Sequence, residues 1–150
     1  MSAKPRLMPP AYFFIFLALS IALHFFFPVK KVIFPPYTYL GFLMIAFGAV
    51  LNLWADYLLK KWKTTVKPHL EPAALVESGP FRLSRNPQYL GFAAILLGVA
   101  FLHGTIITFV FPIAFAVAMQ LLFIPLEEKN MENAFGKKYL EYKKKTRRWI

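Results

Sequence analysis

The chain has 150 residues, of which 58% are hydrophobic and 18% are aromatic, and its formal net charge is +11. Globular proteins average about 45–50% apolar residues, so this composition excludes a disordered chain and an ordinary soluble domain and favours a polytopic membrane protein. Eighteen Lys and Arg against seven Asp and Glu would suggest nucleic acid in a soluble protein. In a membrane protein, such basic residues mark cytoplasmic loops. We therefore expect no nucleic-acid partner.

Two apolar runs in the first 60 residues are long enough to cross a bilayer, which takes about 17–25 residues. The first run covers residues 11–27, and it exceeds the roughly 7–15 apolar residues of a cleaved signal peptide, which is the alternative interpretation. The second covers residues 37–59 and ends in a cluster of lysines. Both are predicted to be transmembrane helices.

Asn52 and Asp56 are four residues apart in the second run, so they share one helix face with Lys60. One interpretation is a polar pocket or ion path inside the membrane. The other is a simple pair between Asp56 and Lys60 near the membrane surface, and we favour it because the lysine supplies the partner that the acid needs.

Residues 89–126 are almost uncharged, but one straight helix of that length would measure about 57 Å, nearly twice the hydrocarbon core. The segment must therefore fold back. The polar, flexible tripeptide at residues 103–105 predicts a tight hairpin between helices over 87–102 and 106–126. Pro112 lacks an amide donor and is expected to kink the second arm.

Glycines recur one heptad apart in two of these helices, at Gly41 and Gly48 and at Gly91 and Gly98. Small residues at such spacing usually allow two helices to pack closely. We expect that structural role for all four.

The segment 127–145 differs from the apolar runs, because Met131, Phe135, Tyr139 and Tyr142 form a stripe at helical spacing and most lysines lie off it. This pattern predicts an amphipathic helix. Its basic face suits an anionic membrane leaflet, and its aromatic stripe could instead pack on the middle loop.

The basic residues also predict the orientation. With a cytoplasmic N-terminus and four crossings, sixteen of the eighteen Lys and Arg lie on the cytoplasmic side, and only Lys30 and Lys31 face the other way. The expected fold is an all-α, multi-pass membrane protein with both termini cytoplasmic. It forms one domain made of two generic transmembrane helices (1–60), a cytoplasmic loop (61–88), the hairpin (89–126) and the amphipathic tail (127–150).

The middle loop contains a strong helix-start signal in Asn86-Pro87, since Asn is favoured as an N-cap and Pro at the first helical position. The amide donors of such a helix end can hold a carboxylate or a phosphate. A plain capping motif is the alternative.

Glu127 and Glu128 follow directly on the apolar hairpin. A carboxylate in this position can accept hydrogen bonds from both hydroxyls of a ribose. Alternatively, the two acids form a solvated pair matched to Arg82 or Arg85. The histidines, His24, His69 and His103, lack the spacing of metal ligands, and the chain has no cysteine, so we predict no metal site.

Together the loop and the tail resemble the integral-membrane methyltransferases that include isoprenylcysteine carboxyl methyltransferase and the phospholipid N-methyltransferases. That family's first motif looks like Leu-Val-x-x-Gly-Pro-Phe/Tyr-Arg-x-x-Arg-His-Pro-x-Tyr-x-Gly, and a Glu-Glu motif with Phe-Gly and two tyrosines follows after a hydrophobic hairpin. The matching residues are Leu75, Val76, Gly79, Pro80, Phe81, Arg82, Arg85, Pro87, Tyr89 and Gly91, then Glu127, Glu128, Phe135, Gly136, Tyr139 and Tyr142.

Three positions depart from the family pattern. Asn86 replaces the usual His, Met131 stands where Leu is commoner, and Phe123 occupies the place of a substrate-handling Arg found in the carboxyl methyltransferases. The last departure disfavours a prenylcysteine substrate.

The resemblance implies that S-adenosylmethionine binds at the cytoplasmic interface and that a lipophilic acceptor, or a membrane lipid, reaches it from within the membrane. The start of the third helix would receive the methionine carboxylate or line the cofactor, Glu127 would hold the ribose, and apolar side chains would contact the adenine. The expected cofactor-binding residues are Leu75, Val76, Phe81, Asn86, Pro87, Tyr89 and Glu127.

Two further residues are candidates for the chemistry itself. Arg85 could anchor a carboxylate acceptor, whereas Glu128 could act as the base for an ammonium acceptor, which must lose a proton before it is methylated. The competing hypothesis is a small non-enzymatic membrane protein, a scaffold or transporter subunit, whose function would depend on Asn52 and Asp56.

Overall fold

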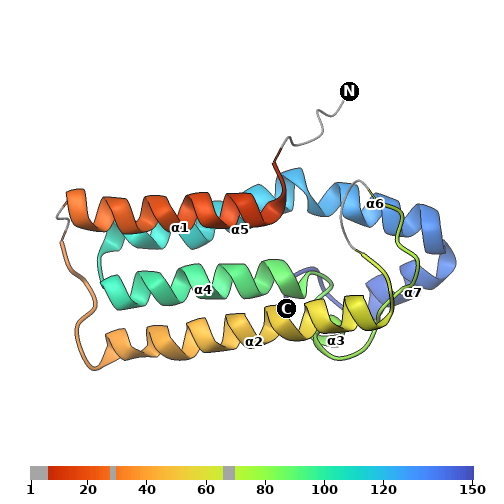
Figure 1. The fold of residues 1–150 in the computed structure, drawn as a ribbon, viewed down its shortest axis with the longest axis horizontal. Helices are drawn as coiled ribbons and strands as arrows, with labels where there is room; N and C mark the ends of the chain where they lie inside the picture. Colours follow the sequence, from red (N-terminus) through yellow and green to blue (C-terminus); the bar gives the residue numbers. More distant parts are fainter. Residues whose placement is uncertain (1–6, 28–29, 66–69) are drawn as a thin grey trace.

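The computed structural model describes residues 7–27, 30–65 and 70–150 (Figure 1). The long helices are α1 (Pro9–Phe26), α2 (Leu40–Lys61), α4 (Pro87–His103) and α5 (Val110–Leu122). Shorter elements are η1 (Tyr37–Tyr39), α3 (Pro80–Leu83), η2 (Ile106–Phe109), α6 (Ile124–Phe135) and α7 (Lys137–Lys145). Apart from an isolated bridge between Lys31 and Thr105, the described chain is helical or irregular. The predicted all-α class is confirmed for these residues.

Helix α4 lies at the centre of the bundle, where it packs against α1, α2 and α5 (Figure 1). The contact with α2 is the most intimate, because Gly41 lies opposite Gly98 and Gly48 lies opposite Gly91. A Cβ atom added at Gly48 would collide with the Gly91 carbonyl oxygen. The predicted close packing is thus confirmed, and we call these four residues the glycine seam.

On its other side, α4 joins an aromatic core with α1 and α5. Phe13 stacks on Phe92 with ring centroids 4.6 Å apart, and Phe115 meets both rings edge-on. Many large apolar side chains point outward instead, for example Leu53 at 72% exposure and Ile113 at 65%. Outward-facing apolar side chains of this density suit a bundle surrounded by lipid.

Three helical segments are long and apolar enough to cross a membrane: Pro9–Phe26, Tyr37–Lys61 and Ile106–Phe135. Helix α4 is apolar but shorter, with 17 residues. The chain is therefore that of a membrane protein, whereas the count of four crossings stays a prediction.

The start of α1, the loop after α2, and helices α6 and α7 gather at one end of the bundle (Figure 1). The bridge between Lys31 and Thr105 lies at the other end. This arrangement agrees with the expected distribution of basic residues, although the cytoplasmic location of that end remains a prediction. Lys4, Arg6 and Lys67, which contributed to the prediction, lie outside the described residues.

The hairpin turn falls where it was expected. Helix α4 ends at His103, and Gly104 follows in the left-handed conformation with φ of 67°. Pro112, where a kink was expected, lies in the first turn of α5, where an amide has no intrahelical acceptor to lose. The break comes later, at Phe123, between α5 and α6.

The tail does not form the single helix predicted over 127–145. Helix α6 begins at Ile124 and ends at Phe135, and α7 begins only after Gly136, whose φ of 50° lies in the region that favours glycine. The glycine redirects the chain, so that α7 turns back toward the loop that follows α2 (Figure 1).

Candidate functional site

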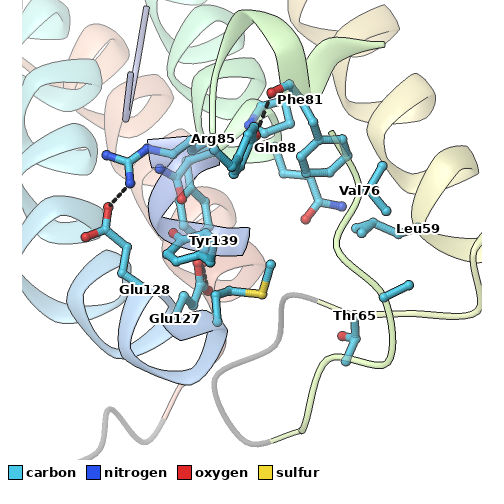
Figure 2. A pocket seen from close by; sticks show the side chains of 15 residues that line it. Leu59, Thr65, Val76, Phe81, Arg85, Gln88, Glu127, Glu128 and Tyr139 are labelled. Atoms are coloured by element: carbon cyan, nitrogen blue, oxygen red, sulfur yellow. Dashed lines mark hydrogen bonds and ion pairs between the residues drawn. The ribbon is translucent and has the colours of Figure 1, made fainter. Parts of the chain in front are cut away.

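A pocket opens at the end of the bundle where α2 ends and α4 begins, and α6 and α7 close its other side (Figure 2). The empty space between its walls is about 620 Å³, which includes space open to solvent.

The pocket brings together most of the residues predicted to bind a cofactor. Six of the seven line it: Val76, Phe81, Asn86, Pro87, Tyr89 and Glu127. Leu75 does not, although it adjoins Val76 and is half-buried. Both candidate catalytic residues, Arg85 and Glu128, also line the pocket.

One side of the pocket is apolar. Leu59 from the end of α2, Val76 from the loop and Phe81 from α3 belong to one buried hydrophobic cluster. The hydroxyl of Thr64 accepts hydrogen bonds from the amides of Ala73 and Ala74, each at 3.0 Å, which ties the loop to the end of α2. This tie holds Val76 against the helix end.

The start of α4 forms part of the pocket, but its cap differs from the prediction. Asn86 occupies the N-cap position, yet its side chain donates to the Arg148 carbonyl at 2.9 Å, and no side chain of the described residues caps the helix. The predicted side-chain capping role is therefore wrong. The amides of Gln88 and Tyr89 in the first turn have no intrahelical acceptor, and both residues line the pocket.

Glu127 projects from α6 and is buried, with 7% of its surface exposed. The Tyr89 hydroxyl donates a hydrogen bond to its Oε1 atom. This bond joins the two helices that face each other across the pocket, and it fixes the carboxylate at the pocket surface.

Glu128 belongs to a network of charges. Arg148 donates from Nε to Oε1 and from Nη2 to Oε2 of Glu128, each at 2.8 Å, so that the pair is bidentate. Arg85 Nη1 lies 3.1 Å from Oε1, and Lys143 Nζ lies 3.7 Å from Oε2. Of the two partners suggested by the sequence, Arg85 is confirmed, whereas Arg82 is exposed and lies outside the network.

Tyr139 and Tyr142 complete the pocket from α7. The Tyr142 hydroxyl donates to the Phe81 carbonyl at 2.5 Å and thereby joins α7 to α3. Burial raises the pKa of Tyr139 to about 12, and burial likewise raises the pKa of Tyr142. Both phenols are therefore neutral hydrogen-bond donors at physiological pH.

Some pocket residues were not among the candidates. Gln88, Met131, Tyr139 and Tyr142 stand in the motif strings, which could have identified them, whereas Leu59, Thr65 and Ala74 come from segments without a motif. Arg148 was missed as well, because its contact with Glu128 depends on the course of the chain beyond α7.

The remaining polar candidates lie elsewhere. Asp56 Oδ2 pairs with Lys60 Nζ at 2.6 Å on the surface, which confirms the interpretation we favoured. Asn52 lies against Gly91 in the seam between α2 and α4. The His24 and His103 rings stack 4.1 Å apart at the opposite end of the bundle, and His69 lies outside the described residues. Within the described ranges, no three His, Cys, Asp or Glu side chains are grouped as metal ligands would be.

Comparison with known proteins gives one family. A family model described as phospholipid methyltransferase matches residues 37–138, from η1 to the start of α7. No curated protein and no solved structure matches the chain.

Proposed function

The chain belongs to the phospholipid methyltransferase family, and from this premise we propose that it transfers a methyl group from S-adenosylmethionine to a lipophilic acceptor at the cytoplasmic face of the membrane. The observation that carries this proposal is the gathering of six of the seven predicted cofactor-binding residues round one pocket. The scaffold or transporter hypothesis would instead need a role for Asp56, which is a surface partner of Lys60.

The pocket has a suitable group for each part of the cofactor. Leu59, Val76 and Phe81 present an apolar surface to a purine ring. On the opposite side, Glu127 presents a buried carboxylate to the ribose hydroxyls (Figure 2). The first turn of α4 presents amide donors to the methionine carboxylate.

Bound S-adenosylmethionine supplies an electrophilic methyl group on a sulfonium sulfur. Methyl transfer is an in-line displacement, so the task of the protein is to hold the two reactants in line more than to supply an acid. The hydrogen bond between Tyr89 and Glu127 would keep the ribose-binding carboxylate in place. The apolar surface would exclude water from that side of the pocket.

We propose a lipid headgroup amine as the acceptor, in preference to an isoprenylcysteine-type carboxylate. Phe123 is 1% exposed and packs edge-on against Tyr12, so the position of the substrate-handling Arg contributes only to the core. An ammonium headgroup must lose a proton before attack. Glu128 is a poor candidate for that base, because Arg148 engages both of its oxygens.

Cofactor binding to the purified protein in detergent tests the proposal. We expect S-adenosylhomocysteine to raise the thermal midpoint of unfolding, because a ligand that binds only the folded state stabilises it. Glu127→Ala removes both carboxyl oxygens that would accept from the ribose hydroxyls and should weaken binding about ten- to a hundredfold. Glu141→Ala is the matched control, since Glu141 is an exposed acid on α7.

The outcomes separate the assignments. A wild-type protein that S-adenosylhomocysteine does not stabilise would contradict the proposed function. A Glu127→Ala variant that binds as tightly as Glu141→Ala would remove only the ribose assignment. If the cofactor binds, methyl transfer can be measured separately to vesicles of a lipid with an amine headgroup and to a prenylated cysteine compound. The acceptor that is methylated distinguishes the two classes.

A further inference from the structure

The last residues of the chain, 146–150, run from α7 back to the first turn of α4, and we call them the C-terminal strap. They lie beyond the residues matched by the family model. The Arg147 carbonyl accepts a hydrogen bond from the Arg85 amide at 2.9 Å. The Arg148 carbonyl accepts from the Ser84 hydroxyl and from the Asn86 side chain, each at 2.9 Å. The strap is therefore joined to the loop that carries the pocket residues.

The strap is also anchored on the other side. The Trp149 indole donates to the Gln120 side chain of α5 at 3.0 Å and packs against the aromatic core. Between this anchor and the loop, the Arg148 guanidinium forms its bidentate pair with Glu128. Hydrogen bonding to Glu128 raises the pKa of Arg148, which therefore stays charged.

Arg85 and Lys143 are two further cations beside Glu128, and Lys143 lies farther away, at 3.7 Å. Arg85 differs from Arg148 in two respects. Its side chain is nine-tenths buried, at 10% exposure, whereas that of Arg148 is 39% exposed. Its Nε and Nη1 atoms make no hydrogen bond with the described residues, although Nη1 lies 3.1 Å from Glu128. A buried guanidinium with unused donors at the wall of this pocket is suited to an anionic group.

We infer that Arg148 is a positioning residue that occupies Glu128 and so keeps Arg85 available for an anionic group of a ligand in the pocket. This inference rests on the proposed function. The anionic group is a carboxylate or a phosphate, and two sources offer it: the methionine part of the cofactor and the phosphate of a lipid acceptor.

The geometry explains why Arg148 matters. Glu128 already lies within ion-pair distance of Arg85, and a carboxylate prefers a bidentate guanidinium. Without Arg148, Glu128 would turn its two oxygens to Arg85 and remove the buried guanidinium from use. Glu128 and the ligand's anionic group thus compete for Arg85. Removal of the Glu128 charge should therefore reverse the effect of losing Arg148.

Ligand affinity and a double substitution test this competition. Arg148→Gln should weaken the binding of S-adenosylhomocysteine, or raise the KM for a phospholipid acceptor, by about tenfold, as expected for a lost charge-assisted bond. Adding Glu128→Gln should restore most of the loss. A strap with only a structural role predicts that the second substitution adds to the damage. The two measurements show whether the cofactor or the acceptor supplies the anion.

The availability of Arg85 can also be measured without a cofactor. Phenylglyoxal modifies accessible, unpaired arginines, and peptide mass spectrometry reports the rate at Arg85. We expect the rate to fall in Arg148→Gln and to recover in the double variant. Lys144→Gln, which removes one exposed charge from the same tail, should leave the rate unchanged. Arg148→Lys keeps a charge near Glu128 and should give an intermediate rate, which covers the case in which Arg148→Gln fails to fold.

The ligand-affinity and phenylglyoxal experiments can contradict the positioning role of Arg148 and the proposed cofactor separately. An Arg85 rate that is the same in Arg148→Gln and Lys144→Gln would overturn the inference, as would a double variant that binds the ligand no better than Arg148→Gln. If the modification rates follow the expected pattern but the wild-type protein binds no S-adenosylhomocysteine, the positioning role stands and the proposed cofactor is wrong.

Discussion

The glycine seam and the C-terminal strap both hold helix α4, the seam along its side and the strap at its first turn. In the seam, α2 and α4 approach until a Cβ atom would strike backbone, at Gly48 and Gly91 for example. In the strap, backbone carbonyls and the Arg148 guanidinium make polar contacts with the pocket loop and with Glu128. The seam is therefore held by close steric packing, whereas the strap is held mainly by hydrogen bonds and by the ion pair between Arg148 and Glu128.

Breaking the seam should lower the stability of the protein. Gly48→Ala adds a methyl group where the Gly91 carbonyl already lies, so the helices must move apart. Overpacking of this kind costs about 1–3 kcal/mol, although Ala is favoured over Gly by about 1 kcal/mol in a helix interior. The sign of the change in thermal midpoint shows which of these two contributions is larger. We expect a lower thermal midpoint in detergent, because overpacking outweighs the helix propensity of Ala. A higher midpoint would show that the seam is not close-packed.

Breaking the link between α7 and α3 should have an effect of similar size. Tyr142→Phe removes the hydrogen bond to the Phe81 carbonyl and leaves a buried acceptor without its partner, which costs about 1–3 kcal/mol. Thermal unfolding of the ligand-free protein measures the loss. Tyr57→Phe is the control, because Tyr57 is 60% exposed on α2. Equal midpoints for the two variants would contradict a role for this bond in closing the pocket.

The seam could be predicted from the sequence, and the strap could not. The heptad spacing of Gly41 and Gly48 is a local pattern, and so is the polar turn at residues 103–105 that the structure confirms. The strap depends on contacts between distant residues, such as the 64-residue separation of Ser84 and Arg148. Periodicity could not reveal them, because Gly136 breaks the tail and changes the direction of everything that follows.

The pocket residues also divide into those that the sequence predicted and those that only the structure identifies. The motif strings predicted that Val76, Phe81 and Tyr89 lie together, and all three line the pocket. Leu59 comes from the end of a generic transmembrane helix, and only its contact with the loop identifies it. The side chain of Asn86 was misassigned for a similar reason, because Arg148 offers an acceptor that local sequence does not show.

The smallest effect is expected at the surface pair on α2, outside both the seam and the strap. Asp56 and Lys60 are close, at 2.6 Å, but their side chains are 48% and 77% exposed. An exposed i,i+4 pair of this kind contributes about 0.3–0.5 kcal/mol, so Asp56→Asn should leave the thermal midpoint and the affinity for S-adenosylhomocysteine nearly unchanged. A variant that keeps its stability but loses function in cells would instead support the transporter hypothesis. An ion path would need the charge of Asp56, whereas it would not need the ion pair with Lys60.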